Sequence, residues 1–111
     1  MVNLLKKKVE VKTVSIGSLV NPIITVSDVP TTAEVGDKIT PKVKVEKAVS
    51  DPVVGAKVDF FTEDTLGVIN LGTRQTTDSS GEATASDSYY VGDAEESQTV
   101  KIVIVIHHKK L

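Results

Sequence analysis

The residue types that most often do chemistry in proteins are scarce in this sequence. The only histidines are the neighbours His107 and His108, and the chain has no cysteine. Neighbouring residues of a strand point to opposite faces, so we do not expect the two imidazoles to share one metal ion. The residues that Ser-His and Cys-His nucleophilic sites require are missing as well, because there is no cysteine and no histidine elsewhere in the sequence. The sequence therefore predicts no catalytic residue, no metal site and no cofactor.

Acidic residues are the remaining candidates for binding an ion. Four of them lie close together in the sequence, namely Asp87, Asp93, Glu95 and Glu96. Their carboxylates are the oxygen ligands that calcium takes, but their spacing does not match an EF-hand loop. An acidic surface loop is the expected interpretation, and the sequence leaves open whether the loop Asp93–Glu96 binds calcium.

Aromatic residues, which would form a platform for sugars, are also few. There is no tryptophan, and the tyrosines and phenylalanines occur as two adjacent pairs, Tyr89–Tyr90 and Phe60–Phe61. Strand alternation points one member of each pair inward, which leaves two rings for a surface. Carbohydrate binding is therefore the weaker alternative.

Length, charge and hydropathy place further limits on the protein. The 111 residues suggest one domain, and the net charge of −2 gives no footprint for nucleic acid. No segment approaches the roughly 18 apolar residues of a membrane helix. The start Met1–Lys8 is not a signal peptide, because its charges follow its apolar residues. Nucleic acid, membrane insertion and a small-molecule ligand are not expected.

The elements that must position these residues are strands. Valine, isoleucine and threonine are abundant, and no stretch of ten residues shows helical periodicity. Alternation in Lys38–Lys47 points Val43 and Val45 inward, and alternation in Ala56–Phe61 does the same for Val58 and Phe60. Turn signals recur at near-regular spacing, including a hairpin-type turn at Asp78–Gly81. The pattern predicts an all-β sandwich of seven to eight antiparallel strands.

Two stretches resemble bacterial immunoglobulin-like domains of the invasin and intimin type. Gly55–Phe60 carries the pattern Gly-x-x-Val-x-Phe, and Thr76–Ala85 contains Thr-Asp-x-x-Gly-x-Ala. The resemblance covers roughly residues 23–106 and implies an immunoglobulin-like β-sandwich. Members of that class serve as spacers and adhesive modules on cell surfaces, and as appended domains on phage capsid and tail proteins. The chain departs from a stalk repeat by standing alone, and by the segment of residues 1–20 before the domain of residues 21–111.

The last predicted strand, Val100–His108, is apolar on both faces, and something must cover its second face. A loop of the same chain, the N-terminal segment folding back, or another subunit would each do so. Residues 1–20 are too apolar for a disordered tail and are either an arm or a first strand, packed in cis or in trans. The residues expected at an interface are Leu4, Leu5, Val9, Val11, Val14, Ile16, Val103 and Val105.

These observations predict a non-enzymatic structural or assembly protein. We expect a virion surface component, in a decoration, capsid-associated or tail role, or a self-assembling surface subunit. Its partners would be further copies of itself or other structural subunits, on a virion or an extracellular surface. The alternative is an adhesin or carbohydrate-binding immunoglobulin-like module of a cell-surface protein.

Overall fold

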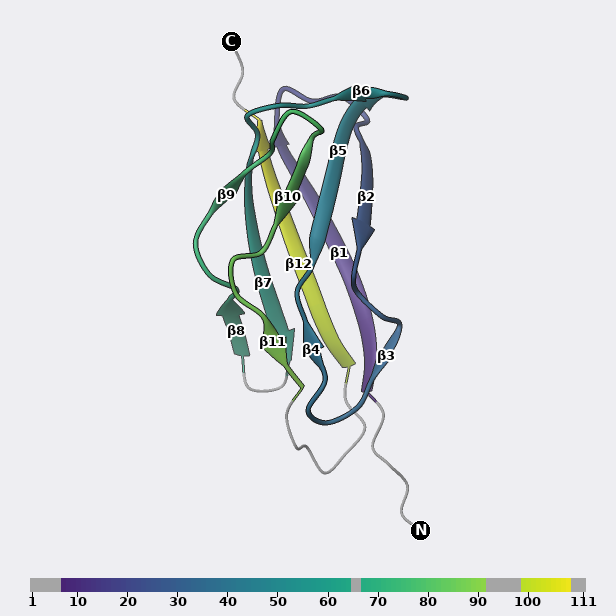
Figure 1. Ribbon diagram of the computed structural model, residues 1–111, viewed down its shortest axis with the longest axis vertical. Coiled ribbons are helices and arrows are strands. Elements are labelled where there is room, and N and C mark those ends of the chain that lie inside the picture. The colour runs from purple at the N-terminus through teal and green to yellow at the C-terminus, as the bar shows by residue number, and fades with distance from the viewer. Residues whose placement is uncertain (1–6, 65–66, 92–98, 109–111) are drawn as a thin grey trace.

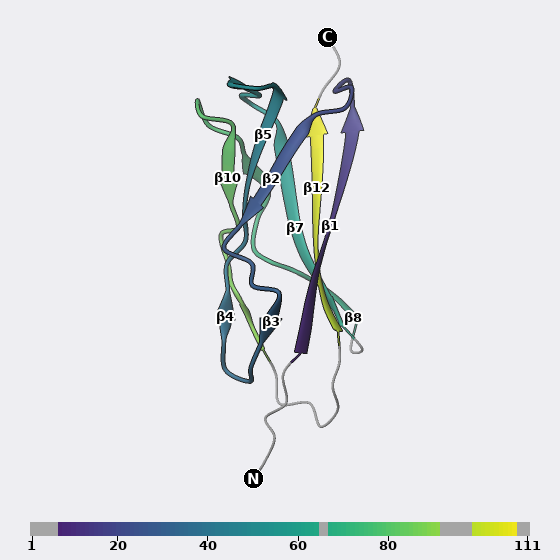
Figure 2. The same ribbon diagram turned by 90° about the vertical axis from the view of Figure 1, so that its right-hand side faces the viewer.

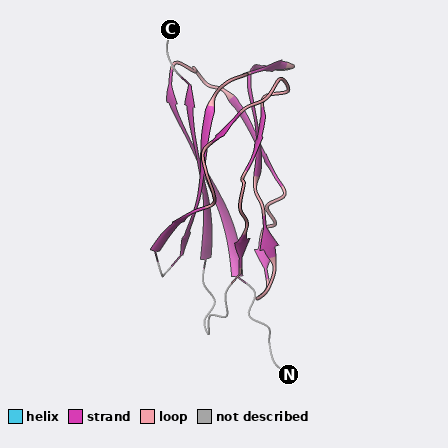
Figure 3. Cartoon of the chain, turned by 60° about the vertical axis from the view of Figure 1, so that its left-hand side comes forward, coloured by secondary structure: helices cyan, strands magenta, loops and turns pink. Residues whose placement is uncertain are grey.

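The computed structural model describes residues 7–64, 67–91 and 99–108, and these ranges contain strands, turns and loops without a helix (Figure 3). The strands in chain order are β1 (Lys7–Gly17), β2 (Ile23–Ser27), β3 (Thr32–Ala33), β4 (Lys38–Ile39), β5 (Lys42–Ala48), β6 (Asp51–Pro52), β7 (Lys57–Asp64), β8 (Gly67–Asn70), β9 (Gln75–Thr76), β10 (Glu82–Thr84), β11 (Tyr89–Tyr90) and β12 (Thr99–His108). The prediction of an all-β chain is confirmed.

The strands form the two layers of a β-sandwich (Figures 1 and 2). The six-stranded sheet has the order β3-β1-β12-β7-β8, with β9 also paired to β7. The opposite layer is the four-stranded sheet β10-β5-β2, in which β6 pairs with β5. The short β4–β11 pair extends this second layer beyond the start of β5 (Figure 1). One edge of each sheet therefore consists of an N-terminal strand, β1 in one layer and β2 in the other.

The prediction that all the strands are antiparallel is wrong for the first and last strands. β1 runs parallel to β12 over ten residue pairs, from Lys8 opposite Thr99 to Gly17 opposite His108. The rest of the chain connects these two strands, so no tight turn forces them into an antiparallel hairpin. The strand β12 is antiparallel to β7 on its other side, which makes the sheet mixed.

Twelve strands in the described ranges exceed the seven to eight expected, partly because predicted strands are divided. The predicted strand Lys38–Lys47 is interrupted at Thr40 and Pro41, so that β4 pairs with β11 whereas β5 pairs with β2 and β10. Proline has no N–H to donate to a strand ladder, which accounts for the interruption at Pro41. Pro41 directly precedes β5 and is buried.

The turn at Asp78–Gly81 forms as predicted, but it does not join a hairpin. The Gly81 N–H donates to the Asp78 carbonyl at 2.9 Å, and Gly81 has a φ of +78°. The strand before the turn, β9, pairs with β7, and the strand after it, β10, pairs with β5. The turn therefore carries the chain from one layer of the sandwich to the other.

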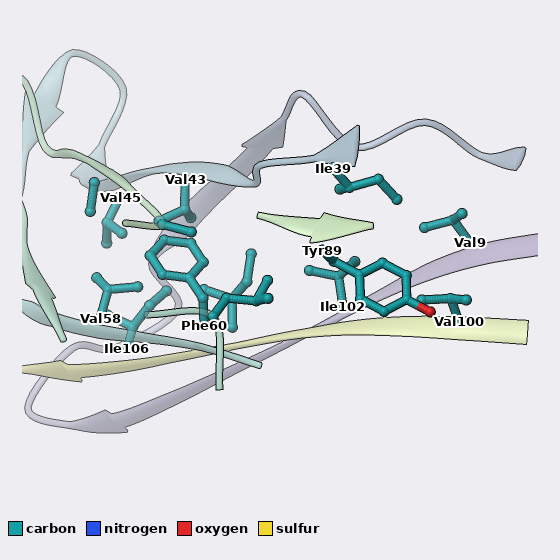
Figure 4. Packing of buried hydrophobic residues seen from close by; sticks show 14 of the residues in the cluster. Val9, Ile39, Val43, Val45, Val58, Phe60, Tyr89, Val100, Ile102 and Ile106 are labelled. Carbon is teal, nitrogen blue, oxygen red and sulfur yellow. The ribbon is translucent and has the colours of Figure 1, made fainter. Parts of the chain in front are cut away.

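The core lies between the two layers and is built from alternate residues of the central strands (Figure 4). The inward residues of β12 are completely buried: Val100, Ile102, Ile104 and Ile106. The predicted inward residues of β5 and β7 are buried as well, namely Val43, Val45, Val58 and Phe60. The rings of Phe60 and Tyr89 lie between the layers (Figure 4). Alternation thus identifies the core face of each central strand correctly.

Candidate assembly surface

The outer edge of β1 is open along most of its length. β3 covers this edge only at Lys7 and Lys8, and the next contact is the Val9 N–H donating to the Thr31 carbonyl at 2.9 Å. In the described part of the chain no strand pairs with β1 on this side beyond Lys8. Among the residues that the structure describes, none pairs with the second side of the segment from Glu10 to Gly17, which is therefore an edge.

Hydrogen bonds at the two ends of β1 show which of its backbone groups face that edge. The Val9 N–H points away from β12, toward Thr31, whereas the Ser18 N–H points to the His108 carbonyl of β12 at 3.2 Å. Backbone groups of successive strand residues point in alternate directions, so odd-numbered residues face outward. The N–H and C=O groups of Val11, Thr13 and Ser15 accordingly lie on the free edge.

An apolar stripe runs across the outer face of the same sheet. Val103 and Val105 of β12 are half-buried. Val103 lies between Phe61 of β7 and Lys12 of β1, and Val105 lies between Asp59 of β7 and Val14 of β1. Among the described residues no strand crosses this face, which is the outer side of the sandwich (Figure 2). Ile16 extends the stripe along β1 and is 49% exposed. The outer side chains of β12 are thus shielded only by side chains of the neighbouring strands β1 and β7. No described strand packs over them.

A charged cluster adjoins the stripe. The Arg74 guanidinium donates two hydrogen bonds to the Asp59 carboxylate, from Nε to Oδ1 at 2.9 Å and from Nη2 to Oδ2 at 2.8 Å. His107 Nε2 lies 3.2 Å from Asp59 Oδ2. The hydrogen bonds from Arg74 lower the pKa of the Asp59 carboxyl, against the raising effect of its partial burial. Asp59 is therefore ionised at neutral pH and holds Arg74 against the sheet.

We expect this cluster to make stability depend on acid. Because its pKa is lowered in the folded state, the Asp59 carboxylate stabilises the fold above its unfolded pKa of 3.8, and that stability is lost as pH falls through the folded pKa. The Asp59→Asn variant should have a melting temperature about 2–4 °C lower at neutral pH and a shallower decline below pH 4. Thermal melts followed by circular dichroism across this pH range measure both effects.

Arg74→Ala provides the matched control, because it removes the donors and leaves the carboxylate. It should reproduce the neutral-pH loss of Asp59→Asn, and the double variant should lose little more than either single variant. Additive losses in the double variant would show that the two side chains stabilise the fold independently, contrary to this interpretation.

The structure separates the residues predicted at an interface into three groups. Val9 is 6% exposed and belongs to the core of its own chain, so we no longer place it at an interface. Val11 and Ile16 are exposed on β1, whereas Val14, Val103 and Val105 lie together on the outer face. Leu4 and Leu5 lie outside the described residues. The segment Lys7–Gly17 pairs in cis, as the edge strand of its own sheet.

The candidates for ion binding are not brought together in the described ranges. Asp87 accepts a hydrogen bond from the Ser88 N–H, while Asp93, Glu95 and Glu96 lie outside those ranges. No group of three histidine, aspartate or glutamate side chains that could hold a metal ion occurs among the described residues.

The two histidines contact different partners. His107 lies beside Asp59, and His108 Nδ1 is 2.7 Å from the Ser18 hydroxyl at the end of β1. Of the aromatic pairs, Phe60 and Tyr89 are buried, whereas Tyr90 is 62% exposed. The prediction that alternation divides each pair is confirmed.

The sequence reasoning missed the Asp59–Arg74–His107 cluster. Alternation did point Asp59 outward, but Arg74 lies in a connection before β9, and His107 comes from the far end of the chain. The register of β7 against β12 places Lys57 opposite His107 and so brings His107 near Asp59. The pairing of β7 with β9 brings Arg74, which directly precedes β9, to the same place. A single sequence carries no signal for that register beyond the alternation itself.

Comparison of the chain with protein-family models, with curated proteins and with solved structures gave no match. In the described residues, no helix is long and apolar enough to cross a membrane. The functional interpretation therefore rests on the open edge of β1 and the apolar stripe beside it.

Proposed function

We propose that this chain is a non-enzymatic structural subunit that assembles with further copies of itself. The open edge of β1, next to the uncovered apolar stripe of Val14, Val103 and Val105, is the observation that carries this proposal. Main-chain groups on an edge supply affinity through strand pairing, and apolar side chains beside it supply buried area.

The two edges of the six-stranded sheet differ in a way that supports this proposal. The edge strand β8 has four residues, and a short edge offers little to a partner. By contrast, β1 has eleven residues and no proline. Its free half, Thr13–Gly17, carries no charged side chain. Edge strands that must stay single are usually short, charged or interrupted. The open segment of β1 is long and uninterrupted, and its charged side chains, Glu10 and Lys12, lie only in its first half.

The finer assignment builds on the resemblance to immunoglobulin-like domains of the invasin and intimin type. We propose an immunoglobulin-like sandwich that serves as a virion surface component or as a subunit of a surface filament. Gly55 precedes β7 with a φ of +87°, and Asp78–Gly81 forms the turn between layers, so both stretches of the resemblance lie at turns that position core strands. Such a rigid sandwich suits a building block.

The Val105→Lys variant tests the proposal through solution mass. The unmodified chain should give a mass above the 11.8 kDa of one copy in light scattering, increasing with concentration. A lysine at position 105 places a charge in the stripe and should shift the mass to that of one copy. The fold should tolerate it, because Val105 lies opposite Asp59 on the outer face and an opposite-charge pair is favourable there.

Val49→Lys is the matched control, because Val49 is 82% exposed in the connection after β5. It should leave the mass of the assembly unchanged. A mass of one copy for the unmodified chain at every concentration would contradict self-assembly. Binding of that monomer to immobilised glycans would then favour the adhesin or carbohydrate-binding alternative.

A further inference from the structure

We propose that a second copy of this chain adds its β1 to the free edge of β1, antiparallel, with Val14 of each copy opposite Val14 of the other. The proposal deepens the assembly function above and depends on it. The result is one continuous sheet through two sandwiches, related by a two-fold axis at Val14.

Free backbone groups on β1 fit this pairing. The outward-facing residues in the open segment are Val11, Thr13, Ser15 and Gly17, since they share the parity of Val9, whose N–H points away from β12. Centring on Val14 pairs Thr13 with Ser15 of the second copy and Val11 with Gly17 of the second copy. These are the hydrogen-bonded pairs of an antiparallel ladder, in which each residue both donates and accepts.

Parity and charge limit the alternatives. Residues that lie opposite one another in an antiparallel pair point to the same face of the sheet. A two-fold axis between two residues would place an odd-numbered residue opposite an even-numbered one, and these point to opposite faces. The axis must therefore pass through a residue. An axis at Lys12 would oppose two lysines, and it would require the Val9 N–H, which already bonds to Thr31. An axis at Ser15 would place Lys12 opposite Ser18, the residue after β1, and would leave Val11 unpaired. Thr13 and Val14 remain as centres.

Side chains favour Val14 over Thr13 as the centre. With the axis at Val14, the outer face gains a Val14–Val14 pair at a closely spaced position, and Lys12 lies opposite Ile16 of the second copy. The apolar stripes of the two copies then join, because Val14 neighbours Val105 in each chain. With the axis at Thr13, Val14 would instead lie opposite Lys12 of the second copy, and the stripes would be separated by charge.

The same register covers exposed apolar surface on both faces of β1. Ile16 on the outer face is 49% exposed and Val11 on the inner face is 41% exposed, and both lie within the paired segment. On the inner face, the hydroxyls of Thr13 and Ser15 of opposite copies come within reach of one another, a cross-strand pair that stabilises sheets.

A single-cysteine scan tests the register, since the chain has no cysteine of its own. In Val14→Cys the two Cα atoms would lie about 4.5 Å apart, which permits a disulfide. Oxidation should convert most of that variant into a covalent dimer on a non-reducing gel. Lys12→Cys and Thr13→Cys are the matched controls, because their own copies would lie beyond the roughly 7 Å limit for a disulfide. The double variant Lys12→Cys/Ile16→Cys should also cross-link, and it replaces Val14→Cys if that variant does not fold.

Each outcome decides between the proposals. Dimers from Val14→Cys and from the double variant, without dimers from the two controls, support the register. Cross-linking of Thr13→Cys instead overturns it in favour of the Thr13 axis. Assembly by light scattering without any cross-link overturns edge pairing but leaves the assembly function standing. A mass of one copy for the unmodified chain overturns both.

Discussion

Replacing Ile104 with alanine is expected to lower the free energy of unfolding by about 2–5 kcal/mol. Ile104 is completely buried at the middle of β12, where its backbone neighbours are Phe60 of β7 and Thr13 of β1. Because β12 is flanked on both sides, the strand cannot shift to fill the space that the smaller side chain leaves. This loss is a large part of the 5–15 kcal/mol that usually separates folded from unfolded domains.

Val105→Ala is the control for this prediction, because Val105 is the next residue of the same strand and faces outward. Its loss should stay below about 1.5 kcal/mol, since a half-buried valine has less to lose. Urea denaturation at a protein concentration low enough for light scattering to show one copy per particle measures both variants without a contribution from association. Equal losses for the two variants would contradict the assignment of the core to the Ile104 face.

Gly81→Ala is expected to have the second largest effect, a loss of at least about 2 kcal/mol. Gly81 has a φ of +78°, which L-residues with a Cβ adopt at a cost. A Cβ there would also lie 2.5 Å from the Val45 carbonyl oxygen and 3.0 Å from the Pro52 Cβ. The Val45 N–H donates to the Gly81 carbonyl at 2.8 Å, so backbone displaced by the clash would also strain this bond.

Gly36→Ala separates the two contributions, because Gly36 also has a positive φ, of +93°, but a Cβ there would meet nothing within 4 Å. The free energy of unfolding of Gly36→Ala should fall only by the conformational cost of the positive φ, about 1 kcal/mol. Urea melts of both variants give the difference. If Gly36→Ala costs as much as Gly81→Ala, then the close approach of the turn to β5 does not contribute.

Local chemistry made part of this fold readable from the sequence. Alternation identified the core residues of β5 and β7, because a strand with one face in the core and the other in solvent alternates apolar and polar residues. The types of residue at Asp78–Gly81 identified the turn, because aspartate and glycine determine its backbone locally. The side chain of Asp78 does accept the Ser80 N–H at 2.9 Å.

Long-range pairing was not readable in the same way. Whether the strand after a turn pairs within the same sheet depends on which sheet has an unpaired strand edge beside it. After Asp78–Gly81 the chain pairs with β5 in the other layer. Likewise, the apolar character of Val103 and Val105 shows that both faces of β12 avoid water. It does not show that β1 lies beside that strand, parallel, with its outer edge open.

The Thr13→Pro variant gives the most direct test that this sandwich assembles through the edge of β1. The Thr13 N–H faces away from β12, so proline there removes no bond of the fold but blocks a strand on the open side. Light scattering should show the unmodified chain above 11.8 kDa and Thr13→Pro at 11.8 kDa, with the same circular dichroism spectrum. A folded Thr13→Pro variant that assembles like the unmodified chain, or an unmodified chain that remains at 11.8 kDa, would contradict the account.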